Sequence, residues 1–292
     1  MKGYIEKFLK DFDYPQDCGN EVLRGYDAIS SGKCARAFNE LIALYDKNEA
    51  LDFKGFIAKI ETELSGALNN KYLAYLITFI ALTRRLYARY IEKGIGEDVY
   101  MLTAVDIKYK AVECKLVKGE WGIFCPDWFS NHFSMKLFGF ENLQFKFSSA
   151  ANDYNCNGYK IEKGTPIIEV HIPRTGGRLD HDGVLKAYAE AAEFFKKHFA
   201  IKKVIFYCGS WLLFPKNLEI LKPQSNLAQF ISDFTIVETS YYDDYSQVWR
   251  LFDMDYTGDP DALPADTSFR RGYVDLIRRG EKTGYGIGFI IY

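Results

Sequence analysis

Residues 165–209 read TPIIEVHIPRTGGRLDHDGVLKAYAEAAEFFKKHFAIKKVIFYCG, and the hydrophobic period changes twice along this stretch. Residues 168–172 alternate between apolar and polar side chains, which is typical of a half-buried strand. From residue 180 to residue 199 the apolar positions follow helical spacing, and residues 204–208 form a short apolar run. The sequence therefore predicts a strand, a glycine-rich turn, a helix and a second strand in succession.

The residues on both sides of this stretch predict further strands of the same sheet, with helices between them. Short strand-like segments precede it, starting near Asn142, and turn residues separate them. A helical stretch, two strands, an N-capped helix and a terminal strand follow it. The other expected strands are 143–147, the segment after the turn at 155–158, 233–238, 248–252 and 284–292, and the expected helices are 215–231 and 266–279.

The first half of the chain has a different pattern. From Lys2 to about Phe138 the apolar residues recur every three or four positions, as they do between Phe53 and Leu64. We therefore predict an α+β fold class with two domains. The first, residues 1–139, is all-helical, and the second, residues 140–292, is an α/β domain with a mixed sheet.

Charge and hydropathy argue against nucleic acid and membranes as partners. The net charge is −2 with scattered Lys and Arg residues, which argues against nucleic acid. The first twelve residues are mixed in charge, unlike a secretory signal. The longest apolar run, Tyr72 to Leu82, falls well short of the ~20 residues of a membrane helix. We therefore expect a cytoplasmic protein with no membrane partner.

Cysteine and histidine spacing gives no support to a metal site. The six cysteines are widely spaced without a CxxC pair, which indicates reduced thiols, and the four histidines show no ligand spacing. Residues 253–261 partly resemble a calcium loop. Pro264 stands where the loop needs its bidentate glutamate, so we interpret this segment as a solvated acidic loop.

Several strings resemble a known family. HIPRTGG, CGSWLL, PQSNLAQF, LPADTSFRR and GYGIGF, together with the order of elements, are similar to bacterial acyltransferase-domain proteins. Those proteins have a helical N-terminal domain and a C-terminal domain like the GNAT-type N-acetyltransferases. The resemblance covers almost the whole chain and implies an acyl-CoA or acetyl-CoA co-substrate. It also implies that the strands at 166–172 and 203–208 part to admit the thioester.

The resemblance places the cofactor's pyrophosphate at the turn before the helix, where unpaired backbone N–H groups favour phosphate. The GNAT signature there is Gln or Arg, two residues, Gly, one residue, then Gly or Ala. Arg174 and Gly177 match it, whereas Leu179 replaces the last small residue. Alternatively, the glycines only shape a tight turn, with Asp180 as the helix cap. The expected cofactor-binding residues are Ile172, Arg174, Gly176, Gly177, Arg178, Leu179 and Asn226, the last of which is alternatively a helix cap.

Candidate catalytic residues lie on the two parting strands. Glu169 and His171 share one strand face, so either is a candidate base that deprotonates an amine. Ser210 or Tyr207, near the end of the second strand, would protonate the departing thiolate. The alternatives are a hydrogen-bonded polar pair for Glu169 and His171, and a helix cap for Ser210. A hydrolase serine is disfavoured because CGSWL lacks the GxSxG glycines.

The resemblance and these residues together imply an acyl-CoA-dependent acyltransferase with a small-molecule acyl donor and a small-molecule acceptor of unknown identity, for which an amine is expected. The alternative is a non-catalytic module of the same fold that binds acyl-CoA, another small ligand or a protein partner. The helical half either shapes an acceptor pocket or acts as a scaffold or dimerisation domain, and the last role would give a homodimer.

Overall fold

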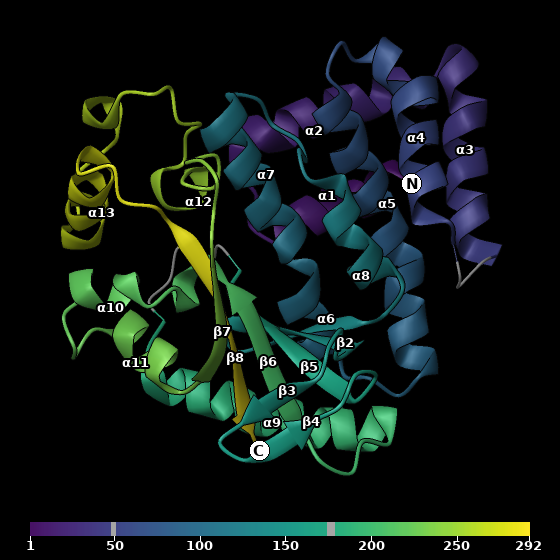
Figure 1. Ribbon diagram of the computed structural model, residues 1–292. Helices are drawn as coiled ribbons and strands as arrows, with labels where there is room; N and C mark the ends of the chain where they lie inside the picture. Colours follow the sequence, from purple (N-terminus) through teal and green to yellow (C-terminus); the bar gives the residue numbers. More distant parts are fainter. Residues whose placement is uncertain (48–50, 174–178) are drawn as a thin grey trace. The chain divides into compact units, whose positions relative to one another are not determined.

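The computed structural model describes residues 1–47, 51–173 and 179–292. The chain divides into two compact units, Met1–Gly139 and Phe140–Tyr292. Strand β1 (Leu137–Phe140) contains the division between them. Helices dominate the first unit and a six-stranded sheet organises the second, so the predicted α+β fold class is confirmed (Figure 1).

The first unit is built around one long helix, α5 (Lys71–Glu92). Asn70 caps this helix by accepting a hydrogen bond from the backbone N–H of Leu73, and every residue from Leu73 to Thr83 is buried. In the described part of the chain, no helix is long and apolar enough to cross a membrane. The other helices of the unit are α1 (Lys2–Asp11), α2 (Gln16–Ile29), α3 (Gly32–Lys47), α4 (Phe53–Leu64), η1 (Ser65–Ala67), α6 (Glu97–Ala104), α7 (Asp106–Lys118), η2 (Pro126–Phe129) and α8 (Ser130–Phe133).

A buried carboxylate lies inside this helical unit. Asp106, the first residue of α7, is fully buried, and its Oδ2 accepts a 2.7 Å hydrogen bond from the indole N–H of Trp128. The same oxygen lies 3.1 Å from Nε2 of His132, which is also buried. Burial opposes ionisation of Asp106, but the contacts with His132, Lys110 and Trp128 outweigh burial and lower its pKa. An ionised carboxylate therefore joins α7 to η2 and α8.

The sheet of the second unit has the strand order β1-β2-β5-β6-β8-β7. Strand β5 pairs antiparallel with β2 and parallel with β6, and β8 pairs antiparallel with both β6 and β7. The strands are β2 (Leu143–Ser149), β5 (Pro166–His171), β6 (Ile205–Ser210), β7 (Thr235–Tyr241) and β8 (Gly284–Ile291), and a separate hairpin joins β3 (Tyr154–Cys156) to β4 (Tyr159–Ile161).

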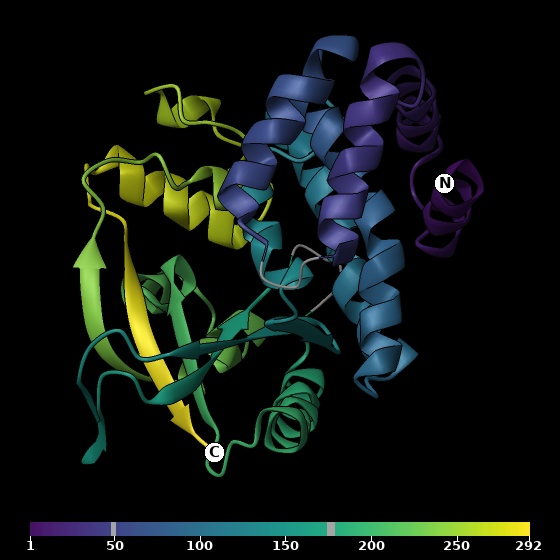
Figure 2. The same ribbon diagram turned by 90° about the vertical axis from the view of Figure 1, so that its right-hand side faces the viewer.

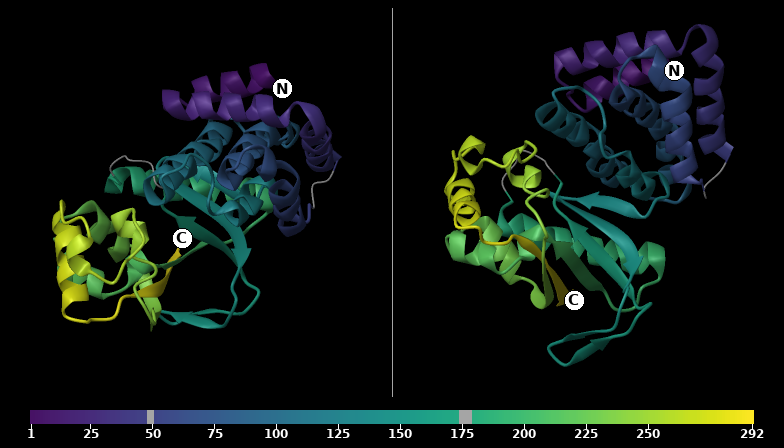
Figure 3. Two further views of the ribbon diagram at one scale, coloured as in Figure 1. Left: turned by 90° about the horizontal axis from the view of Figure 1, so that it is seen from above. Right: turned by 45° about the horizontal axis from the view of Figure 1, so that its top comes forward.

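The two faces of the sheet have different covers (Figures 2 and 3). Helix α9 (His181–Phe199) packs on one face, where the Tyr188 ring lies 5.2 Å from that of Phe206. The β3–β4 hairpin packs on the other face, where Ile161 joins an apolar cluster with Phe289. Because side chains alternate along a strand, the residues before and after Phe206 point away from α9. The shorter helices of this unit are η3 (Trp211–Leu213), α10 (Lys216–Ile220), α11 (Asn226–Ser232), α12 (Trp249–Phe252), η4 (Pro260–Ala262) and α13 (Ser268–Arg278).

Two local predictions were wrong. Residues 248–252 were predicted as a strand, but the structure has helix α12 there, with Val248 and Phe252 buried in a cluster that includes Tyr273 of α13. A short apolar run fits either period, and the spacing of four between these two residues suits a helix packed on α13. The helical pattern was also extended through Phe138, although β1 begins at Leu137.

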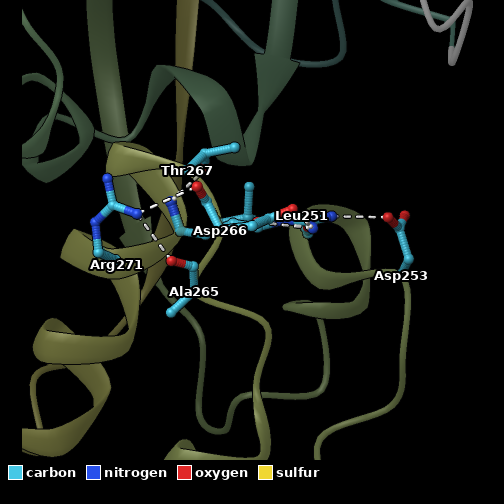
Figure 4. A network of polar contacts seen from close by, with 7 residues as sticks. Leu251, Asp253, Ala265, Asp266, Thr267 and Arg271 are labelled. Carbon is cyan, nitrogen blue, oxygen red and sulfur yellow. Dashed lines mark hydrogen bonds and ion pairs between the residues drawn. The ribbon is translucent and has the colours of Figure 1, made fainter.

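Arginines hold the acidic loop that precedes α13. Arg270 donates from Nη2 to Oδ2 of Asp253 at 2.7 Å and from Nη1 to Asp266, and Arg271 donates to the carbonyls of Ala265 and Asp266 (Figure 4). In the described residues, no group of three or more His, Cys, Asp or Glu side chains could hold a metal ion. Asp253 holds a ligand-like position in the partial match to a calcium loop, and in the structure it forms an ion pair with Arg270.

Glycines let β8 lie close to its neighbours. Gly286 is buried, and a Cβ built on it would lie 2.4 Å from the carbonyl oxygen of Leu213 in η3. A backbone atom cannot move aside as a flexible side chain can. The glycines of GYGIGF therefore serve strand packing.

We predict that Gly286→Ala destabilises the protein by about 1–3 kcal/mol, because the new methyl group overpacks the contact with η3. Urea unfolding followed by circular dichroism measures this loss. Gly66→Ala is the control, since nothing lies within 4 Å of a Cβ at Gly66. Equal stability of the two variants would show that η3 moves away from β8 without penalty.

Candidate active site

Strand β5 presents Glu169 and His171 on the face that points away from α9. Ile168 and Val170, on the opposite face, are buried, so the predicted alternation holds for these four residues. Lys146 lies directly opposite Glu169 on β2, and its Nζ is 2.8 Å from Oε2 of Glu169. Nε2 of His171 lies 3.4 Å from the same oxygen. The structure thus brings the two predicted base candidates together and adds a lysine.

The carboxyl group of Glu169 is a weak proton acceptor. Burial alone would raise its pKa, but the interactions with His171, Lys146 and Ser148 outweigh burial and lower the pKa to about 2. A base should have a pKa closer to the working pH. Of the two candidates, His171 is therefore better suited to accept a proton, and Glu169 is suited to orient its imidazole.

The low pKa of Glu169 predicts an acid-dependent loss of stability. The ionised carboxylate contributes fully above its ordinary pKa of 4.5, and this contribution is lost as the pH falls from about 4.5 to about 2. We expect Glu169→Gln to cost about 3 kcal/mol at pH 7 and almost nothing at pH 2. Urea unfolding across this range measures the difference. Glu162→Gln, in an exposed pair with Lys160, is the control, and parallel stability curves for parent and E169Q would contradict the prediction.

Strands β5 and β6 are paired over a short distance only. Each strand has six residues, yet the paired positions are Ile168 with Phe206 and Glu169 with Tyr207. Strand β6 remains paired with β8 as far as Ser210. Beyond Glu169 and Tyr207, the described residues of β5 and β6 thus form no ladder with each other. Where two strands part in this way, a ligand with peptide-like groups can lie between them as an added strand.

Tyr207 lies at the level where the strands part. It is the cross-strand partner of Glu169, and its half-buried ring packs 5.4 Å from the ring of Phe289. Burial raises the pKa of Tyr207 well above its ordinary value, so its hydroxyl keeps its proton at neutral pH. A protonated phenol at this position can donate to an anion formed in the gap.

Ser210 has a structural contact at the end of β6. Its Oγ accepts a 3.2 Å hydrogen bond from the backbone N–H of Leu212, which caps η3 as the alternative interpretation suggested. Asn217, which the sequence analysis did not single out, is fully buried. Its Nδ2 donates to the carbonyls of Trp211 and Leu212 at 2.7 and 3.0 Å and fixes the shape of this turn.

The predicted cofactor turn is described only at its two ends. Ile172 and Leu179 are half-buried, whereas Arg174, Gly176, Gly177 and Arg178 lie outside the described residues. Helix α9 begins at His181, and Oδ1 of its N-cap residue Asp180 accepts a 2.8 Å hydrogen bond from the backbone N–H of Gly183. One N–H group of the first turn is thus already paired.

Asn226 is the first residue of α11, and its side chain is half-buried. The cap of this helix is the preceding residue, Ser225, whose Oγ accepts a 3.3 Å hydrogen bond from the N–H of Ala228. Capping is therefore the role of Ser225, and the predicted contact of Asn226 with the cofactor stays a prediction.

Comparison with known proteins identifies this arrangement. The model of the GNAT-like C-terminal domain matches residues 137–290, more than half of the chain. The chain belongs to this family. A model of the N-acyltransferase N-terminal domain matches residues 4–135 ahead of the GNAT-like domain. The predicted succession of a helical N-terminal domain and a GNAT-like domain is therefore confirmed.

Solved structures described as acyltransferases share the fold of this GNAT-like protein. A complex with decanoyl-CoA matches with a TM-score of 0.78, and a complex with decanoyl-CoA and teicoplanin with 0.75. Each is 19% identical, and the matches cover 98% of this chain and 86% and 87% of those chains. Comparison with curated proteins gave no match. At this level of identity the likeness establishes the fold.

Proposed function

We propose that this GNAT-like protein is an acyl-CoA-dependent N-acyltransferase. The observation that carries the proposal is the parting of β5 and β6 beyond Glu169 and Tyr207. The pantetheine arm of CoA contains amide groups, which can pair with backbone between the parting strands as an added strand would. The thioester would then lie beside the cluster of Glu169, His171 and Tyr207. The solved complexes of the same fold with decanoyl-CoA support this choice of donor.

The transfer follows from these groups. The acceptor amine attacks the thioester carbonyl, so that a C–N bond forms and the C–S bond breaks. His171, held by Glu169, takes the proton that the amine loses, and a backbone N–H polarises the carbonyl oxygen. The phenolic O–H of Tyr207 donates a hydrogen bond to the departing thiolate, which takes up a proton from solvent, and His171 releases its own proton to solvent. The products are an amide and free CoA.

One observation favours the non-catalytic alternative. The carboxylate of Asp180 already accepts a hydrogen bond from the N–H of Gly183. It also adds negative charge at the start of α9, where the pyrophosphate of CoA would bind. A protein that binds acyl-CoA without turning it over would retain the strand gap and tolerate weaker phosphate binding.

Two measurements separate these functions. Isothermal calorimetry with CoA, acetyl-CoA, octanoyl-CoA and decanoyl-CoA measures binding, and a thiol-detection assay with a panel of amines measures CoA release. The enzyme proposal predicts binding of at least one acyl-CoA and amine-dependent release of CoA. Binding without release would favour the module. Absence of binding to all four ligands would exclude the enzyme and leave only a module that binds another small ligand or a protein.

We also propose that the protein acts in the cytoplasm. Cys18, Cys114, Cys156 and Cys208 are buried as free thiols, and such thiols persist where the medium is reducing. The balanced charge of the sequence gives no support to nucleic acid as a partner.

A further inference from the structure

The first turn of α9 is joined to the segment between α11 and β7 by one polar contact. His181 is the first residue of α9, and Asp233 directly follows α11. Nε2 of His181 lies 2.8 Å from Oδ1 of Asp233, and the two side chains are 30% and 16% exposed. This pair, the His181–Asp233 brace, connects two segments that are 52 residues apart in the sequence.

The brace is anchored on its acidic side. The backbone N–H of Asp233 donates to the carbonyls of Gln229 and Phe230, so the end of α11 fixes its position. Phe234, the next residue, packs edge-on against Tyr188 of α9 with the ring centroids 6.4 Å apart. Burial raises the pKa of Asp233, and the hydrogen bond with His181 acts in the opposite direction. His181 is therefore the group that compensates this half-buried carboxyl.

Two buried oxygens near the brace increase the importance of the His181 contact. In the described part of the chain, Oδ2 of Asp233 and the hydroxyl of Tyr188 have no hydrogen-bond partner. Asp233 thus depends on His181 for the one side-chain hydrogen bond that the structure gives it. Loss of that contact would leave the carboxyl without compensation, and the first turn of α9 would lose its polar link to the segment between α11 and β7.

We infer that His181 and Asp233 are positioning residues that set the first turn of α9 for the diphosphate of the donor. This inference rests on the proposed function, in which that turn receives the diphosphate. The first N–H groups of a helix have no intrahelical partner, and Asp180 takes only that of Gly183. The N–H groups of His181 and Asp182 remain for phosphate oxygens, and the brace holds the residue that carries the first of them.

The test compares donors with and without a diphosphate. Calorimetry would measure the Kd of decanoyl-CoA and of S-decanoyl-pantetheine for the parent, His181→Ala and Asp233→Asn. We expect each variant to bind decanoyl-CoA about tenfold more weakly, which corresponds to ~1.4 kcal/mol, and S-decanoyl-pantetheine as the parent does. His181→Gln, which keeps an N–H donor, should recover part of the loss. The double variant should lose no more than the worse single variant.

Controls separate positioning from a general loss of structure. Lys196→Ala removes an exposed ion pair with Glu193 on the same helix and should leave both Kd values unchanged. Asp233→Asn preserves the shape of the side chain, so it tests the inference even if His181→Ala unfolds. Equal weakening for both donors, or no weakening for decanoyl-CoA, would overturn the inference. Failure of the proposed function appears separately, as absence of CoA release or of donor binding by the parent.

Discussion

Replacement of His171 by alanine should lower kcat by about 10²–10⁴-fold, the range typical of a lost general base. The reason is the division of roles on β5. Glu169 has a pKa of about 2 and would rarely hold a proton at neutral pH, so the imidazole must accept the amine's proton. Because Glu169 acts through His171, we expect Glu169→Gln to cause a smaller loss. The measurement is steady-state release of CoA with a saturating amine.

Controls for this prediction lie in the same unit. His198→Ala changes a histidine near the end of α9 and should leave kcat within about twofold, as expected for a site without a special role. The KM for the acyl donor should change little in His171→Ala, because the imidazole acts on the acceptor. A kcat equal to that of the parent would show that another group acts as the base and that His171 is only a neighbour of Glu169.

Replacement of Asp106 by alanine should destabilise the helical unit by about 3–5 kcal/mol. The substitution leaves the buried His132 without its carboxylate partner and removes the carboxylate that accepts a hydrogen bond from the Trp128 indole. The cost of an unpaired buried group exceeds the net value of the interaction that is removed. Urea unfolding followed by tryptophan fluorescence and circular dichroism measures the loss.

Asp98 offers a matched control, because it lies in the first turn of α6 as Asp106 lies in that of α7. Asp98 is exposed, so Asp98→Ala should change the unfolding free energy by less than about 0.5–1 kcal/mol. If Asp106→Ala costs no more than Asp98→Ala, then water or a rearranged side chain satisfies His132 and Trp128, and the buried carboxylate is not needed for stability.

The central part of the fold could be predicted from the sequence because each of its segments keeps a single hydrophobic period, either that of a helix or that of a strand. Helix α9 has a polar cap, Asp180, and a regular apolar stripe, and residues 168–171 of β5 alternate between buried and half-buried. The segment at 248–252 failed because five residues cannot separate a strand from a helix when the deciding contact is with α13. The helical stretch at 215–231 was predicted and is present as α10 and α11.

The candidate site was predictable only within one strand. Glu169 and His171 share a face by alternation alone, whereas Lys146 joins them through the register of β2 against β5, which one sequence does not reveal. The His181–Asp233 contact was missed for the same reason, since its residues are remote in sequence. In the sequence, these two residues are a histidine at the start of a helix and an aspartate at the end of another. Both are common in surface turns, so neither indicates a contact between them.

The short pairing of β5 and β6 has a consequence for how this family can diverge. Peptide groups are the same in every residue, so a ligand held as an extra strand is recognised without regard to most side chains. Substitutions along the gap would then alter the acceptor or the length of the acyl chain while the donor's arm kept its place. Mutational drift should accordingly be freest at the side chains around the gap and most restricted where backbone must come close, as it does at Gly286.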